Sequence, residues 1–321
     1  MEISRNTDAP NAQIPVPTVV RPETPDLRVR RRVNLVKWLG IASGTFLSIV
    51  ALAGILAPLI APWDPVYQDL TAMFVPPFWE PGGNVHHLLG TDELGRDILS
   101  RLIYGARESL LISCSAVALA AVFGTTVGLV GGYAGGSRRG FAILLDRALL
   151  AATEISLAIP GLVLAIAVVA LFGPTERNLI LVLAVFGWVV FARLARGLVL
   201  GLHNRAFVEA AQILGAKHRR IILRHMVPYV LPHIIVVAAL QVGFMILVES
   251  ALGFLGLGIQ PPTPTWGNMV AEGREYLNTN PWEGVLAGLT ITLTVLSLSF
   301  VADLIRTRLT RSGGTGPAAG L

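Results

Sequence analysis

The sequence predicts an all-α polytopic membrane protein with about six transmembrane helices. Of its 321 residues, 53% are hydrophobic and only 14% are charged, whereas soluble domains carry about 25% charged residues. The charged residues also cluster, and they leave long apolar runs between them. A helix needs about 20 apolar residues to cross the hydrocarbon core. Because lipid offers backbone groups no water to bond, runs of this length are expected to be helical.

Six apolar runs are candidates for these helices. A membrane β-barrel is excluded because its strands would alternate apolar and polar residues in segments of about ten. A shorter run at 178–192 continues into Arg193 and Arg196, so its last turn is expected at the interface. The other five runs contain no Asp, Glu, Lys or Arg and cover 38–63, 109–137, 155–175, 226–248 and 284–302.

Lysine and arginine lie mainly on one side of these predicted spans. The chain has 25 such residues, and all but five fall in segments that six spans would place on the N-terminal side. Basic residues collect in cytoplasmic loops, so both termini are expected in the cytoplasm. The same bias explains the net charge of +5, so the charge gives no reason to expect binding to nucleic acid. The five exceptions are Arg96, Arg101, Arg107, Arg177 and Arg274.

The segments between the spans indicate how the chain is organised. Prolines scattered among polar residues predict a disordered cytoplasmic tail at 1–34. Three prolines at 261, 262 and 264 disfavour a regular helix in the last outside loop, and the glycines of 131–136 predict a turn leaving the membrane. We therefore expect a first transmembrane helix at 35–63, an extracytoplasmic loop at 64–106, a transmembrane core at 107–310 containing a cytoplasmic loop at 203–228 and an extracytoplasmic loop at 256–283, and a cytoplasmic tail at 311–321.

The sequence lacks motifs for catalysis or for its own energy supply. A phosphate-binding P-loop requires Gly-Lys-Ser/Thr, but neither Lys37 nor Lys217 follows a glycine. We therefore expect a non-enzymatic chain that binds no cofactor and depends on a partner for ATP hydrolysis. Cys114 is the only cysteine and is expected to pack as a small apolar residue. His86 and His87 lack a third ligand held nearby, so no metal site is expected.

The cytoplasmic loop at 203–228 contains the most informative segment. Glu209, Ala210 and Ala211 favour a helix, and Gly215 can end it by adopting a positive φ. The basic stretch 217–225 predicts a second short amphipathic helix, and Pro228 limits the structure that can follow it. Two short helices meeting at a glycine would form a rigid knob suited to transmitting a push.

This segment resembles the EAA loop of ABC importer permeases. The pattern Glu-Ala-Ala-x3-Gly is followed by Pro228 thirteen residues after Gly215, although His225 to Pro228 replaces the usual I-x-L-P. The segments 87–97 (HLLGTDELGRD), 101–107 (RLIYGAR) and 254–268 (FLGLGIQPPTPTWGN) are similar to the second, C-type permease of dipeptide, oligopeptide and nickel importers. The resemblance covers roughly residues 35–310 and implies the type I ABC importer permease fold.

The resemblance also implies function and partners. The chain would pair with a second homologous permease, and two ATP-binding cassette subunits carrying ATP and Mg would each grip one coupling loop. An extracytoplasmic solute-binding protein would deliver peptides, with nickel or another small solute as the alternative. An ion-gradient-driven transporter would instead show charged midplane residues in several spans and a repeated half, but the sequence shows at most two such acids and no evident repeat. The implied coupling residues are Glu209, Ala210, Ala211, Gly215, Arg219, Arg220, His225 and Pro228.

Other residues are candidates for the pathway or for partner contact. Glu154, Pro160 and Glu249 lie in or near spans, where a carboxylate should face protein or water. Each has an alternative: Glu154 could pair near an interface, Pro160 could only shape packing, and Glu249 could be a buried structural residue. The residues expected to contact the binding protein from the outside loops are Asp92, Arg96, Asp97 and Trp266.

Overall fold

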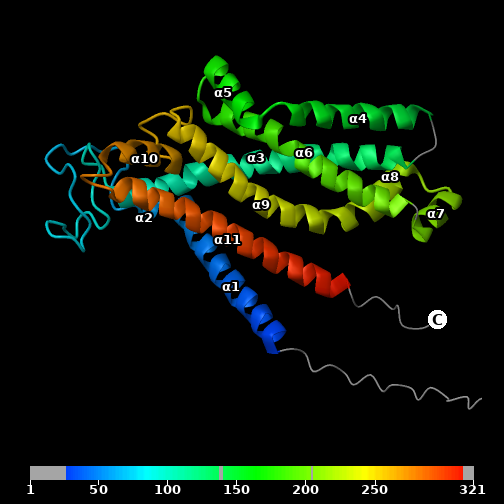
Figure 1. The fold of residues 1–321 in the computed structure, drawn as a ribbon, viewed down its shortest axis with the longest axis horizontal. Helices are drawn as coiled ribbons and strands as arrows, with labels where there is room; N and C mark the ends of the chain where they lie inside the picture. The colour runs from blue at the N-terminus through cyan, green and yellow to red at the C-terminus, as the bar shows by residue number, and fades with distance from the viewer. Residues whose placement is uncertain (1–26, 137–139, 204, 314–321) are drawn as a thin grey trace, which may run out of the picture.

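The computed structural model describes residues 27–136, 140–203 and 205–313, and within these ranges the regular structure is helical. In Figure 1 the helices α3, α6, α9 and α11 run in similar directions, and α1 crosses them at an angle. The loop 61–97 and α10 lie at one end of this bundle, and α7 and α8 lie at the other. The long helices are α1 (Leu27–Ile55), α3 (Ile98–Gly135), α6 (Glu176–His203), α9 (Val227–Phe254) and α11 (Trp282–Gly313).

These five helices are each long and apolar enough to contain a membrane span. The residues predicted to form one span at 155–175 do not form a single helix. It is divided between α4 (Gly140–Ala158) and α5 (Gly161–Phe172), which are bent by 80°. Proline lacks a backbone N–H and disfavours helical geometry at the residue before it, which explains the break at Ile159 and Pro160. If the bent pair is one span, the described chain has up to six, in agreement with the sequence.

The closest helix pair is α3 with α6, and glycine makes the approach possible. Gly124, Gly128 and Gly132 recur every four residues on the face of α3 that meets α6. A Cβ atom at Gly124 would lie 2.2 Å from the carbonyl oxygen of Trp188, and one at Gly128 would lie 2.3 Å from that of Ala192. Small residues at this spacing let membrane helices pack backbone to backbone, where dispersion replaces the hydrophobic driving force that lipid removes.

Several boundaries differ from the sequence-based expectations. The helix α1 begins at Leu27 rather than at 35, and α11 continues to Gly313 rather than ending at 310. The helix α3 begins at Ile98, inside the predicted loop 64–106, and it includes the glycines of 131–135 that were expected to turn. The rest of the predicted tails, 1–26 and 314–321, lies outside the described residues.

The end of the bundle opposite α7 is built from irregular segments and short helices. The short α2 (Ala57–Ile60) follows α1, and the loop 61–97 then leads to α3. The predicted loop 256–283 contains α10 (Trp266–Gly273) and the 3-10 turn η2 (Arg274–Tyr276), so the expectation of an irregular segment holds only up to Thr265. Thr265 and Asn268 form a capping box, which satisfies free N–H groups at the start of α10.

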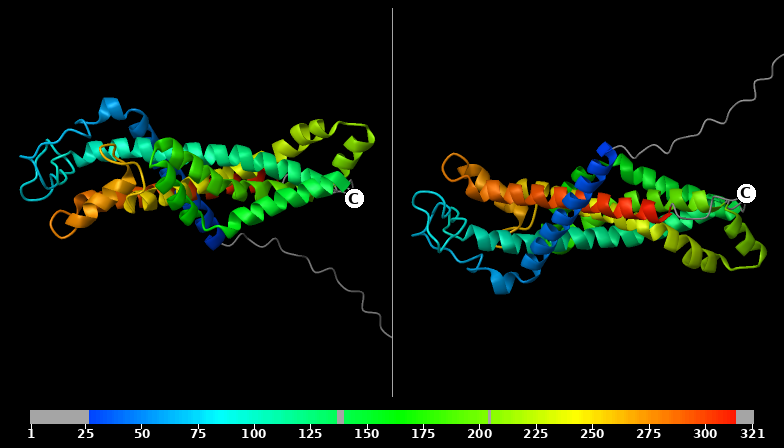
Figure 2. Two further views of the ribbon diagram at one scale, coloured as in Figure 1. Left: turned by 90° about the horizontal axis from the view of Figure 1, so that it is seen from above. Right: turned by 90° about the horizontal axis from the view of Figure 1, so that it is seen from below.

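The opposite end carries three short helical elements. These are α7 (Ala206–Ile213), α8 (His218–Ile221) and the π-helix η1 (Ile222–Met226), which leads directly into α9. Figure 2 shows this segment projecting beyond the long helices, while α1 crosses the bundle diagonally.

Candidate functional site

The segment 206–226 contains the two short helices that the sequence predicts. They lie on either side of Gly215, whose φ of +74° permits the sharp turn between them. Pro228 lies in the first turn of α9, directly after the π-helix η1, and α8, η1 and α9 follow one another without a loop.

The core of the bundle anchors this segment at several points. Val208 of α7, Ile221 of α8 and Met226 of η1 are fully buried in the main hydrophobic cluster. The hydroxyl of Tyr133 on α3 also forms a hydrogen bond with the imidazole of His218. A force applied to the tip of the segment would therefore reach α3 and α9 through packed side chains.

The tip of the segment presents apolar side chains next to basic ones. Ile213 and Leu214, directly before Gly215, are 85% and 86% exposed. The adjoining hollow of about 490 Å³ is lined by Leu223 and by four basic residues, Lys217, Arg219, Arg220 and Arg224. Two apolar residues before a helix-ending glycine were a readable signal in the sequence, but Ile213 and Leu214 were not among the predicted site residues.

The residues predicted for coupling are placed as follows. Ala210, Gly215, Arg219, Arg220, His225 and Pro228 are exposed. Glu209 and Ala211 belong to α7, but their side chains lie outside the described part of the structure.

The candidates for a pathway or gate are not brought together. Glu249 of α9 is completely buried, and it accepts hydrogen bonds from the hydroxyls of Ser109 (3.2 Å) and Ser250 (3.4 Å). Its Oε1 has no partner among the described residues. Glu154 of α4 is exposed and forms no ion pair within the described ranges, and Pro160 marks the bend before α5.

A second site, which we call the Arg101 cluster, lies at the end of the bundle opposite α7. It consists of Asp92, Glu93, Arg96, Arg101, Glu272 and Glu283. The guanidinium of Arg101 is almost fully buried and donates to Asp92, Glu283 and Glu272, the last at 2.7 Å. Arg96 donates to Asp92 (2.7 Å), Glu93 (2.9 Å) and Glu272 (2.8 Å). These bonds connect the loop 61–97 and α3 with α10 and α11.

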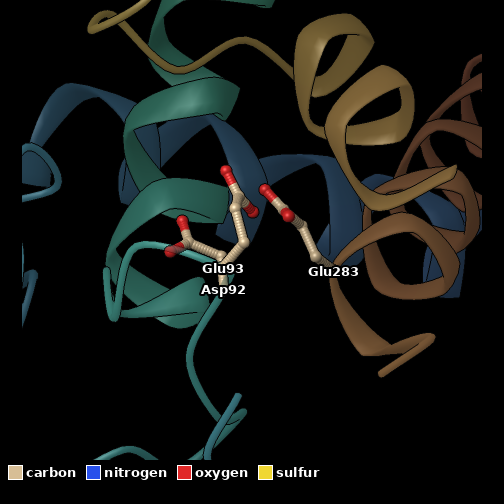
Figure 3. Close-up of side chains that lie close together, drawn as sticks. All are labelled: Asp92, Glu93 and Glu283. Atoms are coloured by element: carbon tan, nitrogen blue, oxygen red, sulfur yellow. The ribbon is translucent and has the colours of Figure 1, made fainter. Parts of the chain in front are cut away.

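The Arg101 cluster contains four carboxylates and two guanidinium groups. Figure 3 shows Asp92, Glu93 and Glu283 converging from the loop and from α11, and one oxygen from each lies within 4.8 Å of the others. Burial raises the pKa of Glu93 above its usual range, and the neighbouring carboxylate of Asp92 raises it further. Because Arg96 and Arg101 already bind Asp92 and Glu283, the geometry is that of a buried ionic network.

The four residues expected to contact a binding protein have structural positions instead. Asp92, Arg96, Asp97 and Trp266 are each at most 3% exposed, so their side chains offer no surface for docking in this conformation. Asp97 caps α3 by accepting from the N–H of Ser100 at 2.8 Å. Trp266 donates from Nε1 to the carbonyl of Leu102 at 3.1 Å. The sequence could not separate buried pairing from surface exposure in these loops.

The fold and the projecting segment define a polytopic helical membrane protein with a helical hairpin at one end. Comparison of its sequence with protein families shows which class this is. The chain belongs to the family described as the inner membrane component of binding-protein-dependent transport systems, whose model matches residues 110–312.

Several curated relatives are similar over most of their length. The di/tripeptide transport system permease protein DppC of Pseudomonas aeruginosa (strain UCBPP-PA14) is 41% identical over 261 residues, which cover 81% of this chain and 84% of the relative. The dipeptide transport system permease protein DppC of Haemophilus influenzae is 40% identical, with coverage of 81% and 86%. The corresponding protein of Escherichia coli K12 is 41% identical, with coverage of 81% and 85%.

Among solved structures, the chain resembles one of the inward-facing MetNI methionine ABC transporter. The match has a TM-score of 0.53 at 20% identity, and it covers 64% of this chain and 94% of the other. At this identity the match shows the fold alone, and that fold is the type I ABC importer permease fold of the sequence-based prediction. The chain is thus a non-catalytic, multi-pass permease subunit of the bacterial inner membrane, in a family that acts with ATPase and binding-protein partners.

Proposed function

We propose that this permease translocates small peptides, dipeptides foremost, as one half of an ATP-driven import pathway. The observation that supports the substrate class is the identity of about 41% to dipeptide permeases from several species. It extends over 84–86% of the length of those relatives, so it is not confined to a shared coupling loop. Nickel is the alternative solute from the sequence, and no feature of the described residues favours it.

We further propose that the segment 206–226 is the docking site of the partner ATPase. Its exposed apolar tip at Ile213 and Leu214 would enter a hydrophobic groove, while Lys217, Arg219 and Arg220 would face acidic residues of the ATPase. Both termini would then be cytoplasmic, because α1 runs towards the opposite end of the bundle and α11 runs back from it. A solute-binding protein would meet the opposite end, at the loop 61–97 and α10.

The mechanism depends on how this segment is anchored. Two ATPase subunits, holding ATP and Mg, would move one such segment on this chain and one on a second homologous permease. Because Val208, Ile221 and Met226 are packed in the core, the segment cannot slide freely over the bundle. Its displacement would therefore tilt α9 and α3 and change which end of the pathway is open.

The test is ATP-dependent uptake of a radiolabelled dipeptide into proteoliposomes containing the copurified transporter and its binding protein. Leu214→Asp and Gly215→Asp are expected to abolish uptake, since one puts a charge on the apolar tip and the other adds a side chain at positive φ. Gly201→Ala is the matched control, because a Cβ there meets open space.

The outcomes separate docking from substrate choice. Normal uptake by both variants in an intact complex would refute the docking assignment. Wild-type uptake of labelled nickel but of no dipeptide would refute the peptide assignment and leave docking unaffected.

A further inference from the structure

A groove of about 570 Å³ runs between α1 and the three helices α3, α9 and α11. Its walls are apolar along most of their length, and they include Leu47 and Val50 of α1, Leu111 of α3, Val242 of α9 and Leu298 of α11. All four helices belong to candidate membrane spans. The groove therefore lies at the depth of the hydrocarbon, where an open apolar cleft is filled by lipid or by protein.

Arg107 is the one charged residue among those that line this groove. Its side chain is exposed, and it forms no ion pair with any described residue, including the adjacent Glu108. It stands two residues before the uncharged run 109–137, which places its guanidinium at the level of lipid headgroups. Gly54 of α1 fixes this end of the groove, because a Cβ there would lie 3.0 Å from the backbone nitrogen of Arg107.

The charge at one end of the groove decides between a lipid and a helix of a partner subunit as its occupant. An apolar helix would leave Arg107 without a counter-charge, whereas a phospholipid brings an apolar chain and an anionic phosphate together. A single hydrocarbon chain also bends to follow the walls.

We propose that this groove binds an anionic phospholipid in the leaflet nearest the loop 61–97. One acyl chain lies between α1 and α3, and the phosphate of the headgroup pairs with Arg107. One phospholipid would both fill the apolar cleft at hydrocarbon depth and pair with Arg107, which has no ion pair with any described residue at the headgroup end of the cleft. It does not depend on the solute that the permease carries.

The test uses phosphatidylglycerol and phosphatidylcholine, each with the same photoactivatable diazirine on an acyl chain. The transporter, purified through a tag on this chain with the subunits that copurify, is placed in nanodiscs containing either probe. After illumination, mass spectrometry maps the lipid adducts. We expect phosphatidylglycerol to label the peptides around Leu47 and Cys114 about fivefold more than phosphatidylcholine does, which corresponds to about 1 kcal/mol for one basic residue near a membrane surface.

Two matched substitutions make the result decisive. Arg107→Gln is expected to reduce labelling by phosphatidylglycerol to that by phosphatidylcholine, whereas Arg177→Gln is expected to leave the ratio unchanged. Arg177 is a suitable control because it is also exposed, also adjacent to a glutamate, and also without an ion pair among the described residues. A third variant, Ala51→Trp, should fill the groove and remove labelling there by both lipids.

Three results would overturn the proposal. The first is equal labelling by the two lipids in the wild-type protein, which would mean that the groove is an apolar surface without preference for a headgroup. The second is an Arg107→Gln variant that keeps the preference for phosphatidylglycerol. The third is absence of groove labelling by either lipid, which would mean that a protein segment fills the cleft.

Discussion

Removing the central guanidinium of the Arg101 cluster should destabilise the permease strongly. The side chain of Arg101 is 1% exposed and donates to three carboxylates. In Arg101→Met, Asp92 and Glu272 keep Arg96 as a partner, but Glu283 loses its only ion pair within the described chain. Breaking a buried ion pair by removing one partner costs about 3–5 kcal/mol, because an uncompensated charge stays buried.

The measurement is the temperature at which the purified transporter loses its monodisperse peak after heating in detergent. At about 2–4 °C per kcal/mol for a domain of a few hundred residues, the expected fall is on the order of 10 °C. The control is Arg177→Met, which removes an exposed arginine without an ion pair in the described ranges and should change stability by less than about 0.5 kcal/mol.

A double variant tests the physical cause. Arg101→Met combined with Glu283→Gln removes the stranded charge together with its former partner, so it should recover a large part of the loss. If the single variant is no less stable than the Arg177→Met control, the cluster does not hold this end of the bundle together. If the double variant is no better than the single one, the loss arises from packing and not from an unpaired charge.

Three further predictions concern Gly128, Glu93 and Glu249. Gly128→Ala should lower the free energy of unfolding by about 1–3 kcal/mol, because the added methyl group forces α3 away from α6. Gly288→Ala, where a Cβ meets open space, should not lower the temperature at which the monodisperse peak is lost. Equal effects of the two substitutions would contradict the role of Gly124, Gly128 and Gly132 in helix packing. Because the pKa of Glu93 is raised in the folded state, its ionisation reduces stability as the pH rises above the ordinary pKa of a glutamate. Glu93→Gln should therefore be as stable as the wild type at acidic pH and more stable at neutral pH. The difference should be less than about 1 kcal/mol, because Arg96 compensates part of the charge of Glu93. A wild-type protein that is the more stable of the two at neutral pH would contradict this prediction. Glu249→Gln should keep both stability and uptake, since an amide oxygen can still accept the serine hydroxyl bonds; loss of uptake with normal stability would instead make Glu249 part of the gate.

The segment 206–226 could be predicted because its signals are local. Helix-forming residues before Gly215, basic residues after it and the uncharged runs on both sides are all visible within a short window of sequence. The structure confirms the two helices and the positive φ of Gly215. It adds the exposure of Ile213 and Leu214, which depends on which face of the segment the bundle covers.

The Arg101 cluster could not be predicted in the same way. Arg101 meets Glu272 and Glu283 across separations of 171 and 182 residues. In sequence these are charged residues near predicted interfaces, and such residues are usually expected to face water. Only the arrangement of α10 and α11 around the start of α3 shows that these residues are partners, with Arg101 and Glu283 buried.

By itself, the sequence determined that the chain enters the membrane, about how many times, and where the hairpin with Gly215 forms. Membrane insertion and turn formation are decided by consecutive residues, through the cost of placing charges and unpaired backbone groups in lipid. Only the tertiary structure decided that the span at 155–175 bends by 80°, that Asp92, Arg96, Asp97 and Trp266 are buried, and that a groove opens beside Arg107. Those features depend on distances between helices that are remote in sequence, and no local pattern of polarity contains them.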